Sequence, residues 1–144
     1  MARRRTHAPR CSPPQPLRTA DAATVIIGLA RHDPVEAETI CLLTDDAHLP
    51  VSCIVVEGGG LPDDVFPIAE MLQELAHTLP IAHITVASCR PGHGFEEADV
   101  DRWHELVATL AEGGLELVEW FIQDEKLLVA VTPLARKVTR WPAV

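Results

Sequence analysis

The sequence contains no apolar run that approaches the roughly 20 residues needed to span a bilayer. Its basic start, residues 1–5, is followed by prolines and arginines rather than an apolar segment, so no secretory signal is predicted. The four cysteines show no C-x-x-C spacing, and Cys41, Cys53 and Cys89 lie in or beside apolar runs. These absences predict a cytoplasmic protein with free, buried thiols.

Common nucleotide and hydrolase motifs are also missing. The chain has no G-x-x-x-x-G-K-[ST] sequence, which excludes a P-loop, no G-x-G-x-x-G after an expected strand and no G-x-S-x-G elbow. The run Gly58-Gly59-Gly60 offers backbone N–H groups to a phosphate, but Asp63 and Asp64 would repel an anion there. A flexible turn is therefore the favoured interpretation of this run.

Charge is distributed unevenly, and the formal net charge is −9. Residues 1–20 contain five arginines and no acid, residues 21–125 contain all 21 acids and three arginines, and residues 126–144 are basic. The acidic body repels phosphates, which argues against a nucleic-acid groove on the folded part. Contact with nucleic acid is expected only through the basic N-terminal tail.

A single domain is expected from 144 residues. Residues 1–21 form a Pro/Arg-rich tail without periodicity, which predicts disorder, and residues 22–144 are assigned to the domain. The first apolar run, residues 24–30, is of strand or helix type and is taken as a strand. The other expected strands are residues 39–44, 51–57, 82–89, 115–122 and 126–132.

Two amphipathic helices are expected between these strands, over residues 63–79 and 96–111. The apolar stripe of the second helix consists of Val100, Trp103, Val107, Leu110 and Ala111. The order β-β-β-α-β-α-β-β predicts an α/β fold in which helices pack on a single mixed β-sheet.

Large aromatic side chains give further expectations about packing. Trp103 lies on the apolar stripe and is predicted to be structural. Trp120 and Phe121 are adjacent on a strand and therefore point to opposite faces of the sheet. Trp141 is interpreted either as an anchor that docks on the body or as part of an interface.

The loop after the strand at residues 82–89 is the most suggestive region for a site, because α/β proteins often place sites at carboxyl ends of strands. Its polar residues are Ser88, Cys89, Arg90 and His93, followed by Glu96, Glu97, Asp99 and Asp101. Cys89 and His93, with Asp99 or Asp101, form a possible metal-binding set or a nucleophilic pair. The alternative is a buried strand end and a solvated histidine. Asp101 is also explained as a helix-start carboxylate or as a partner for Arg90.

Several stretches resemble one known family. A helix begins P-D-D-V-F, a loop reads S-C-R-P-G-H, and a strand reads L-E-L-V-E-W-F-I before it turns into a final hairpin. With these elements, residues from about 39 to 132 resemble the RadC-type JAB (JAMM/MPN) domain. The family's loop reads H-N-H-P-S-G within an H-x-H-x10-D motif. Laid without gaps, its proline falls on Pro91, its aspartate on Asp101 and its two histidines on Ser88 and Arg90.

The departures from the motif decide what the resemblance implies. Family enzymes hold zinc with the two histidines and the aspartate, whereas serine is a poor zinc ligand and the cationic Arg90 would repel Zn²⁺. The family's motif serine falls on Ala98, and its upstream glutamate is placed loosely on Glu57. The resemblance implies a JAB-like α-β-α sandwich that holds no metal or cofactor.

The functional hypotheses come from different classes. The first is a non-enzymatic interaction module that binds a protein partner or a second copy of itself, without membrane contact. The alternative is a metal-binding or hydrolytic enzyme that uses Cys89, His93 and a nearby carboxylate. A third is a nucleic-acid-associated protein that acts through its basic ends.

Overall fold

The computed structural model describes residues 15–135 and Trp141. At its centre is a five-stranded sheet with the order β2-β1-β3-β4-β5. The strands are β1 (Glu38–Thr44), β2 (Pro50–Glu57), β3 (His83–Cys89), β4 (Glu116–Gln123) and β5 (Leu128–Ala130). Strands β3 and β4 are parallel and the other neighbours are antiparallel, so the predicted single mixed sheet is confirmed.

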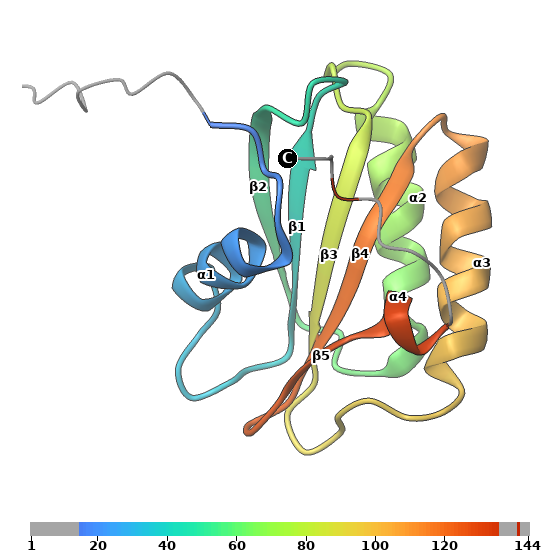
Figure 1. The fold of residues 1–144 in the computed structure, drawn as a ribbon. Helices are drawn as coiled ribbons and strands as arrows, with labels where there is room; N and C mark the ends of the chain where they lie inside the picture. Colours follow the sequence, from blue (N-terminus) through green and yellow to red (C-terminus); the bar gives the residue numbers. More distant parts are fainter. Residues whose placement is uncertain (1–14, 136–140, 142–144) are drawn as a thin grey trace, which may run out of the picture.

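Helices lie on both faces of this sheet (Figure 1). They are α1 (Ala20–Ala30), the short 3-10 helix η1 (Pro62–Asp64), α2 (Val65–Leu75), α3 (Asp99–Glu112) and α4 (Val131–Leu134). Helices α2 and α3 cover one face, and α1 lies over part of the other. The α/β class with helices packed on one sheet is therefore confirmed.

The prediction of a strand over residues 24–30 is wrong, because these residues belong to helix α1. Thr19 caps this helix, since its Oγ1 accepts a hydrogen bond from the N–H of Ala22 at 3.1 Å. Ala23 and Ile27 are the buried residues of α1, and their spacing of four places both on one face. The apolar run therefore has a helical burial period that its composition did not reveal.

The expected last strand, residues 126–132, is also longer than the observed one. Strand β5 ends at Ala130, and Val131 begins α4. The N–H of Thr132 donates to the Glu119 carboxylate at 3.0 Å instead of to a neighbouring strand. The Glu119 carboxylate thus accepts the hydrogen bond that a backbone carbonyl of a neighbouring strand would otherwise accept.

The last residues of the expected tail, residues 15–21, lie within the described structure. Residues 1–14 lie outside the described part of the chain. Leu17 is buried, and its N–H donates to the carbonyl of His48 at 2.8 Å. The folded body therefore begins before residue 22.

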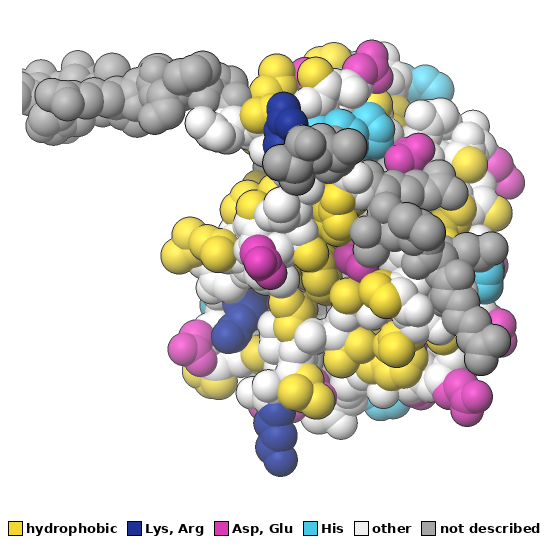
Figure 2. Space-filling view, in the orientation of Figure 1, with side chains coloured by type: hydrophobic (Ala, Val, Ile, Leu, Met, Phe, Trp, Pro, Cys, Tyr) yellow, Lys and Arg dark blue, Asp and Glu magenta, His cyan; other side chains and the backbone are white. Residues whose placement is uncertain are grey.

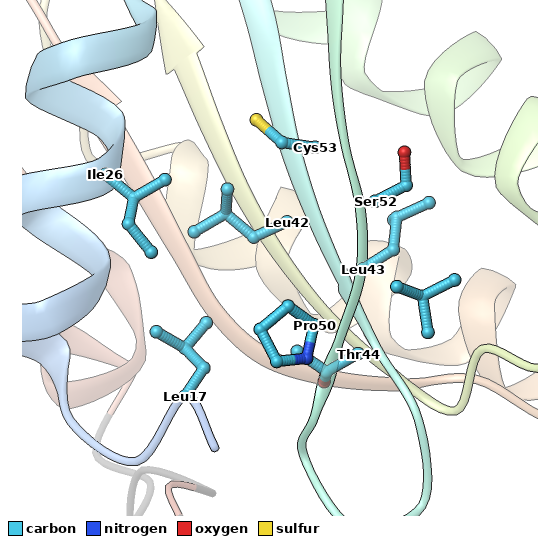
Figure 3. A pocket seen from close by; sticks show the side chains of 9 residues that line it. Leu17, Ile26, Leu42, Leu43, Thr44, Pro50, Ser52 and Cys53 are labelled. Atoms are coloured by element: carbon cyan, nitrogen blue, oxygen red, sulfur yellow. The ribbon is translucent and has the colours of Figure 1, made fainter. Parts of the chain in front are cut away.

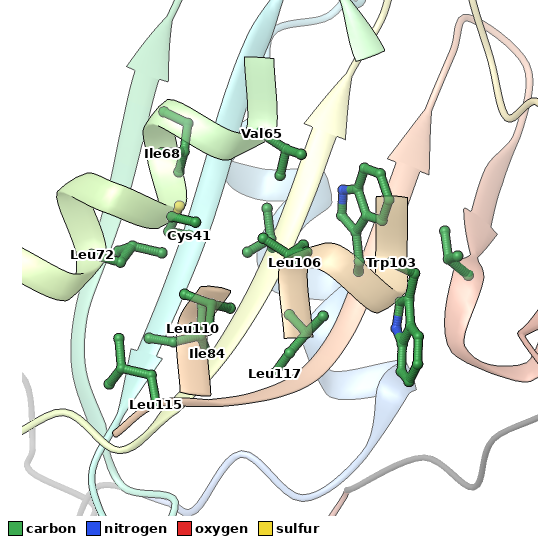
Figure 4. Close-up of a cluster of buried hydrophobic side chains, with 14 of the residues drawn as sticks. Cys41, Val65, Ile68, Leu72, Ile84, Trp103, Leu106, Leu110, Leu115 and Leu117 are labelled. Carbon is green, nitrogen blue, oxygen red and sulfur yellow. The ribbon is translucent and has the colours of Figure 1, made fainter. Parts of the chain in front are cut away.

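Two hydrophobic clusters fill the two sides of the sheet. The larger lies beneath α2 and α3 and includes Trp103, Leu106 and Trp120 (Figure 4). The smaller lies beneath α1 and includes Ile27 and Phe121. Trp120 and Phe121 therefore point to opposite faces, as predicted.

Smaller packing predictions are resolved as well. Trp141 packs against the cluster beneath α1, in agreement with its interpretation as an anchor. Cys41 and Cys89 are free and buried, whereas Cys53 is free but exposed, so the expectation of burial is wrong for Cys53. Cys11 lies outside the described residues.

Within residues 15–135, no helix has the length and apolar character needed to cross a membrane.

Helix α3 is rotated relative to the predicted stripe. Its buried residues are Asp99, Trp103, Leu106 and Leu110, whereas Val100 and Val107 are half-buried and Ala111 is exposed. Trp103 remains structural, as predicted, and its Nε1 donates to Thr132 Oγ1 at 2.9 Å. The rotation places an acidic residue, Asp99, at the buried start of the stripe.

Candidate functional site

The candidate site lies where β3 ends, and the alternation of the strand separates its first two residues. Ser88 points toward α2 and α3, where its Oγ accepts a hydrogen bond from Trp120 Nε1 at 2.9 Å. Cys89 points to the other face and packs beneath α1. Burial raises the pKa of its thiol to about 11, so Cys89 is not activated as a thiolate nucleophile.

Arg90 follows the strand and lies in a buried ion pair. Its Nη1 and Nη2 donate to the two carboxylate oxygens of Asp99 at 2.9 and 3.0 Å. The exposed fractions of the two side chains are 1% and 0%. The guanidinium also lies over the Trp120 ring, 5.5 Å from its centroid. A buried cation therefore occupies the centre of the predicted site.

A second arginine closes the other side of Asp99. Arg102 Nη1 donates to Asp99 Oδ1 at 3.0 Å and also contacts Glu96. Its Nε donates to Asp63 of η1 at 2.8 Å. The network thus joins the end of β3, η1 and the first turn of α3.

The charge of Asp99 is stabilised despite its burial. Burial alone would raise the pKa of this carboxyl, but hydrogen bonds from Arg90, the Glu96 backbone and Arg102 outweigh it. The pKa of Asp99 therefore lies below its ordinary value of 3.8. The carboxylate is ionised at neutral pH and its oxygens are already engaged.

Asp101 does not belong to this cluster, which corrects the predicted site. Its side chain is exposed, whereas Asp99, two residues earlier, is buried and faces Arg90. The sequence does contain a signal for this arrangement. Asp99 precedes Trp103 by four residues and so extends the buried stripe by one turn. An acid on an apolar stripe requires a cationic partner, and Arg90 is close in the sequence.

The remaining predicted residues lie apart. His93 is half-exposed in the loop, and its Nε2 is 3.4 Å from Glu96. Glu57 is exposed at the end of β2, where its Cα pairs with that of Glu38 on β1. Among residues 15–135 and Trp141, no group of three His, Cys, Asp or Glu side chains is arranged to hold a metal ion.

The residues that would match the zinc motif do not fit zinc. The Ser88 hydroxyl is buried and bonded to Trp120. Arg90 brings a positive charge into the place where the metal would need a donor. Asp99 is the single carboxylate at the centre, and two guanidinium groups hold it. The chemistry of this cluster is that of a structural cross-link.

The sequence interpretation missed two other buried acids. Glu38 accepts hydrogen bonds from the backbone N–H and the Nδ1 of His32, at 2.8 and 2.7 Å. Glu119 accepts N–H groups of Trp120 and Thr132 through Oε2, while its buried Oε1 has no partner among the described residues. Both acids interrupt or border apolar strands, which is the signal that would have identified them.

An apolar cavity of about 200 Å³ lies elsewhere, between α1 and β2 (Figure 3). Leu17 and Ile26 line it from the α1 side, and Leu42 lines its floor. Pro50 and Cys53 line it from β2. It offers few polar groups, so it resembles a contact surface more than a catalytic pocket.

The chain matches no protein-family model, no curated protein and no solved structure.

Proposed function

We propose that this chain is a non-enzymatic α/β interaction module that resembles a RadC-type JAB domain whose zinc ligands have been replaced. The observation that carries the proposal is the buried ion pair of Arg90 and Asp99. A guanidinium group there neutralises the carboxylate that a metal would otherwise bind. An arginine in that position supports a fold held together without zinc.

The identity of the buried aspartate adds to the argument. A motif laid without gaps reaches Asp101, which is exposed, whereas Asp99 faces Arg90. Asp99 would take the motif's aspartate position only if the loop were two residues shorter than the family's. The resemblance then retains one charged residue of the motif in a buried position and replaces the two histidines.

The surface supports contact with another protein. Large exposed apolar side chains occur on α1, at Val25 and Leu29, and on β2, at Val55. Figure 2 shows hydrophobic side chains gathered over α1 and the adjacent part of this face. Exposed apolar side chains that gather on an otherwise acidic surface are typical of a site that a partner covers.

Zinc binding tests the proposal. The wild-type protein is expected to retain no zinc after dialysis, whereas Ser88→His/Arg90→His restores the two imidazoles beside Asp99 and is expected to bind about one equivalent. The matched control, Ser88→His/Arg90→His/Asp99→Asn, lacks the carboxylate and should lose that zinc. Circular dichroism checks that each variant folds.

The enzyme alternative receives no support from these positions. Cys89 is buried beneath α1 and has a raised pKa, and His93 is in contact with Glu96. Stoichiometric zinc in the wild-type protein, lost in Cys89→Ala or His93→Ala, would contradict the proposal.

A further inference from the structure

Strand β2 lies at the edge of the sheet, and none of the described residues pairs with its outer side. We infer that this edge pairs antiparallel with β2 of a second copy, so that two five-stranded sheets join across a two-fold axis. The inference rests on the proposed function in that it names the partner of the interaction module. It does not depend on the absence of zinc, so the two can fail separately.

The backbone direction of β2 is fixed by its neighbour. The N–H of Gly58 donates to Ala37 O at 2.8 Å, so the backbone groups of residue 58 point toward β1. Polar groups alternate along an antiparallel strand, and the β1–β2 register is regular from Glu57 back to Ser52. Cys53, Val55 and Glu57 therefore direct their N–H and C=O groups outward.

Edge strands in natural proteins are usually protected, and β2 has little protection. Lysines, internal prolines and bulges are the common devices that block pairing. Proline occurs here only at the first position, Pro50, the pairing with β1 is irregular only beside it, at Val51, and the single charge is at the last position, Glu57. The six residues between them are uncharged, and a strand of this kind is suited to sheet extension.

The distribution of charge favours a second copy as the occupant. The chain carries a net charge of −9, so two copies repel each other over most of their surfaces. Helix α1 and strand β2 carry only Asp21 and Glu57 between them. Two acidic bodies meet with least repulsion through this part of the surface.

One register fits the two-fold symmetry best. With the axis at Ile54, Cys53 of each copy lies opposite Val55 of the other, and Glu57 lies opposite Val51. The outward backbone groups of Cys53 and Val55 then form hydrogen-bonded pairs on both sides of the axis, and the two Glu57 carboxylates are at opposite ends. An axis at Val55 or Cys53 shortens the paired segment or places Glu57 nearer the centre.

Helix α1, which lies beside the exposed edge of β2, adds apolar surface to the proposed contact. Two paired strands alone would not provide this surface. Ile26 of α1 and Cys53 of β2 line the cavity beside the edge (Figure 3). Leu29 lies three residues after Ile26 on the same helical face, and its side chain is 83% exposed. A two-fold axis perpendicular to the sheet brings both α1 helices to one face, next to the joined strands.

Sedimentation equilibrium of the full chain tests the pairing. At high micromolar concentration, the wild-type mass is expected to be twice the 15.7 kDa of one chain. Val55→Pro removes an outward N–H and should return the mass to that of one chain, while the matched control Val55→Thr keeps the N–H and the dimer. A wild-type monomer, or a dimer that persists in folded Val55→Pro, would overturn the inference.

Disulfide trapping tests the register and does not require the proline variant to fold. Residue 54 lies on the axis, in a pair without hydrogen bonds, where Cα atoms are close enough for a disulfide. In a Cys11→Ser/Cys53→Ser background, Ile54→Cys is expected to give a disulfide-linked dimer on mild oxidation. Val56→Cys, opposite Ser52, should not. Equal trapping at both positions, or none at 54, would overturn the register.

Discussion

The guanidinium of Arg90 and the carboxylate of Asp99 form a two-armed ion pair with N–O distances of 2.9 and 3.0 Å, and neither side chain is more than 1% exposed. The pair joins the end of β3 to the first residue of α3. Both partners have been removed from water, so loss of Asp99 leaves Arg90 as an unpaired buried charge, and loss of Arg90 leaves Asp99 with Arg102 alone.

Removal of one partner of this pair is expected to be costly. Arg90→Met leaves Asp99 buried with Arg102 as its remaining cationic partner and should reduce the free energy of unfolding by about 3–5 kcal/mol. Arg90→Met/Asp99→Asn removes the buried charge as well and should cost less than Arg90→Met. Urea unfolding of both variants and of Asp99→Asn gives the coupling energy. Additive losses would show that the two side chains do not stabilise each other.

Trp103 is expected to be the most sensitive position of α3. Trp103→Ala removes a ring that is 4% exposed and should reduce the free energy of unfolding by roughly 3–5 kcal/mol. Trp103→Phe keeps much of the buried area, loses the hydrogen bond to Thr132 and leaves a smaller cavity, so it should cost less than the alanine variant. Thermal unfolding compares them, and an alanine variant that melts like the wild type would contradict this packing.

Leu17 is expected to belong to the folding unit. Its side chain is 7% exposed, so Leu17→Ala should cost about 2–5 kcal/mol. The matched control is Leu61→Ala, because Leu61 is 71% exposed and belongs to neither α1 nor β2, so its loss should change the stability by less than about 0.5 kcal/mol. Equal melting temperatures for the two variants would place Leu17 outside the cooperative unit.

Glu119 is expected to make stability fall as the pH rises. Burial raises the pKa of this carboxyl above its ordinary value of 4.5, although backbone N–H groups of Thr132 and Trp120 oppose the shift. Between 4.5 and the raised pKa the folded state binds more protons than the unfolded state, so the free energy of unfolding decreases with pH. Glu119→Gln should remove this slope in urea unfolding series. Parallel profiles for the two proteins would contradict the buried carboxyl.

His32 is expected to stabilise the protein on the acidic side of neutrality. The hydrogen bond to Glu38 raises the pKa of the imidazole above 6.5, and the charges of Glu36 and Glu38 add to the shift. The stabilisation is therefore complete below 6.5 and is lost as the pH rises through the raised pKa. His32→Asn should reduce stability mainly below 6.5. Glu36→Gln serves as a control with a smaller effect, and a loss independent of pH would rule out the ion pair.

The sequence by itself determined the class of the fold. Apolar runs over residues 39–44, 51–57 and 115–122 became neighbouring or nearby strands, because period and β-branched content identify strands locally. The helical spacing of the apolar residues around Trp103 likewise predicted that α3 packs on the sheet. The sequence also shows that positions 88 and 90 of the loop carry serine and arginine rather than imidazoles.

Only the tertiary structure decided which residues meet. Residues 24–30 have a composition compatible with either a strand or a helix, and the cap at Thr19 and burial beneath the sheet decide for α1. The rotation of α3 by packing selects Asp99 rather than Asp101 as the partner of Arg90. Such choices depend on contacts between segments distant in the chain, such as Trp103 with Thr132, and the local pattern alone does not decide between them.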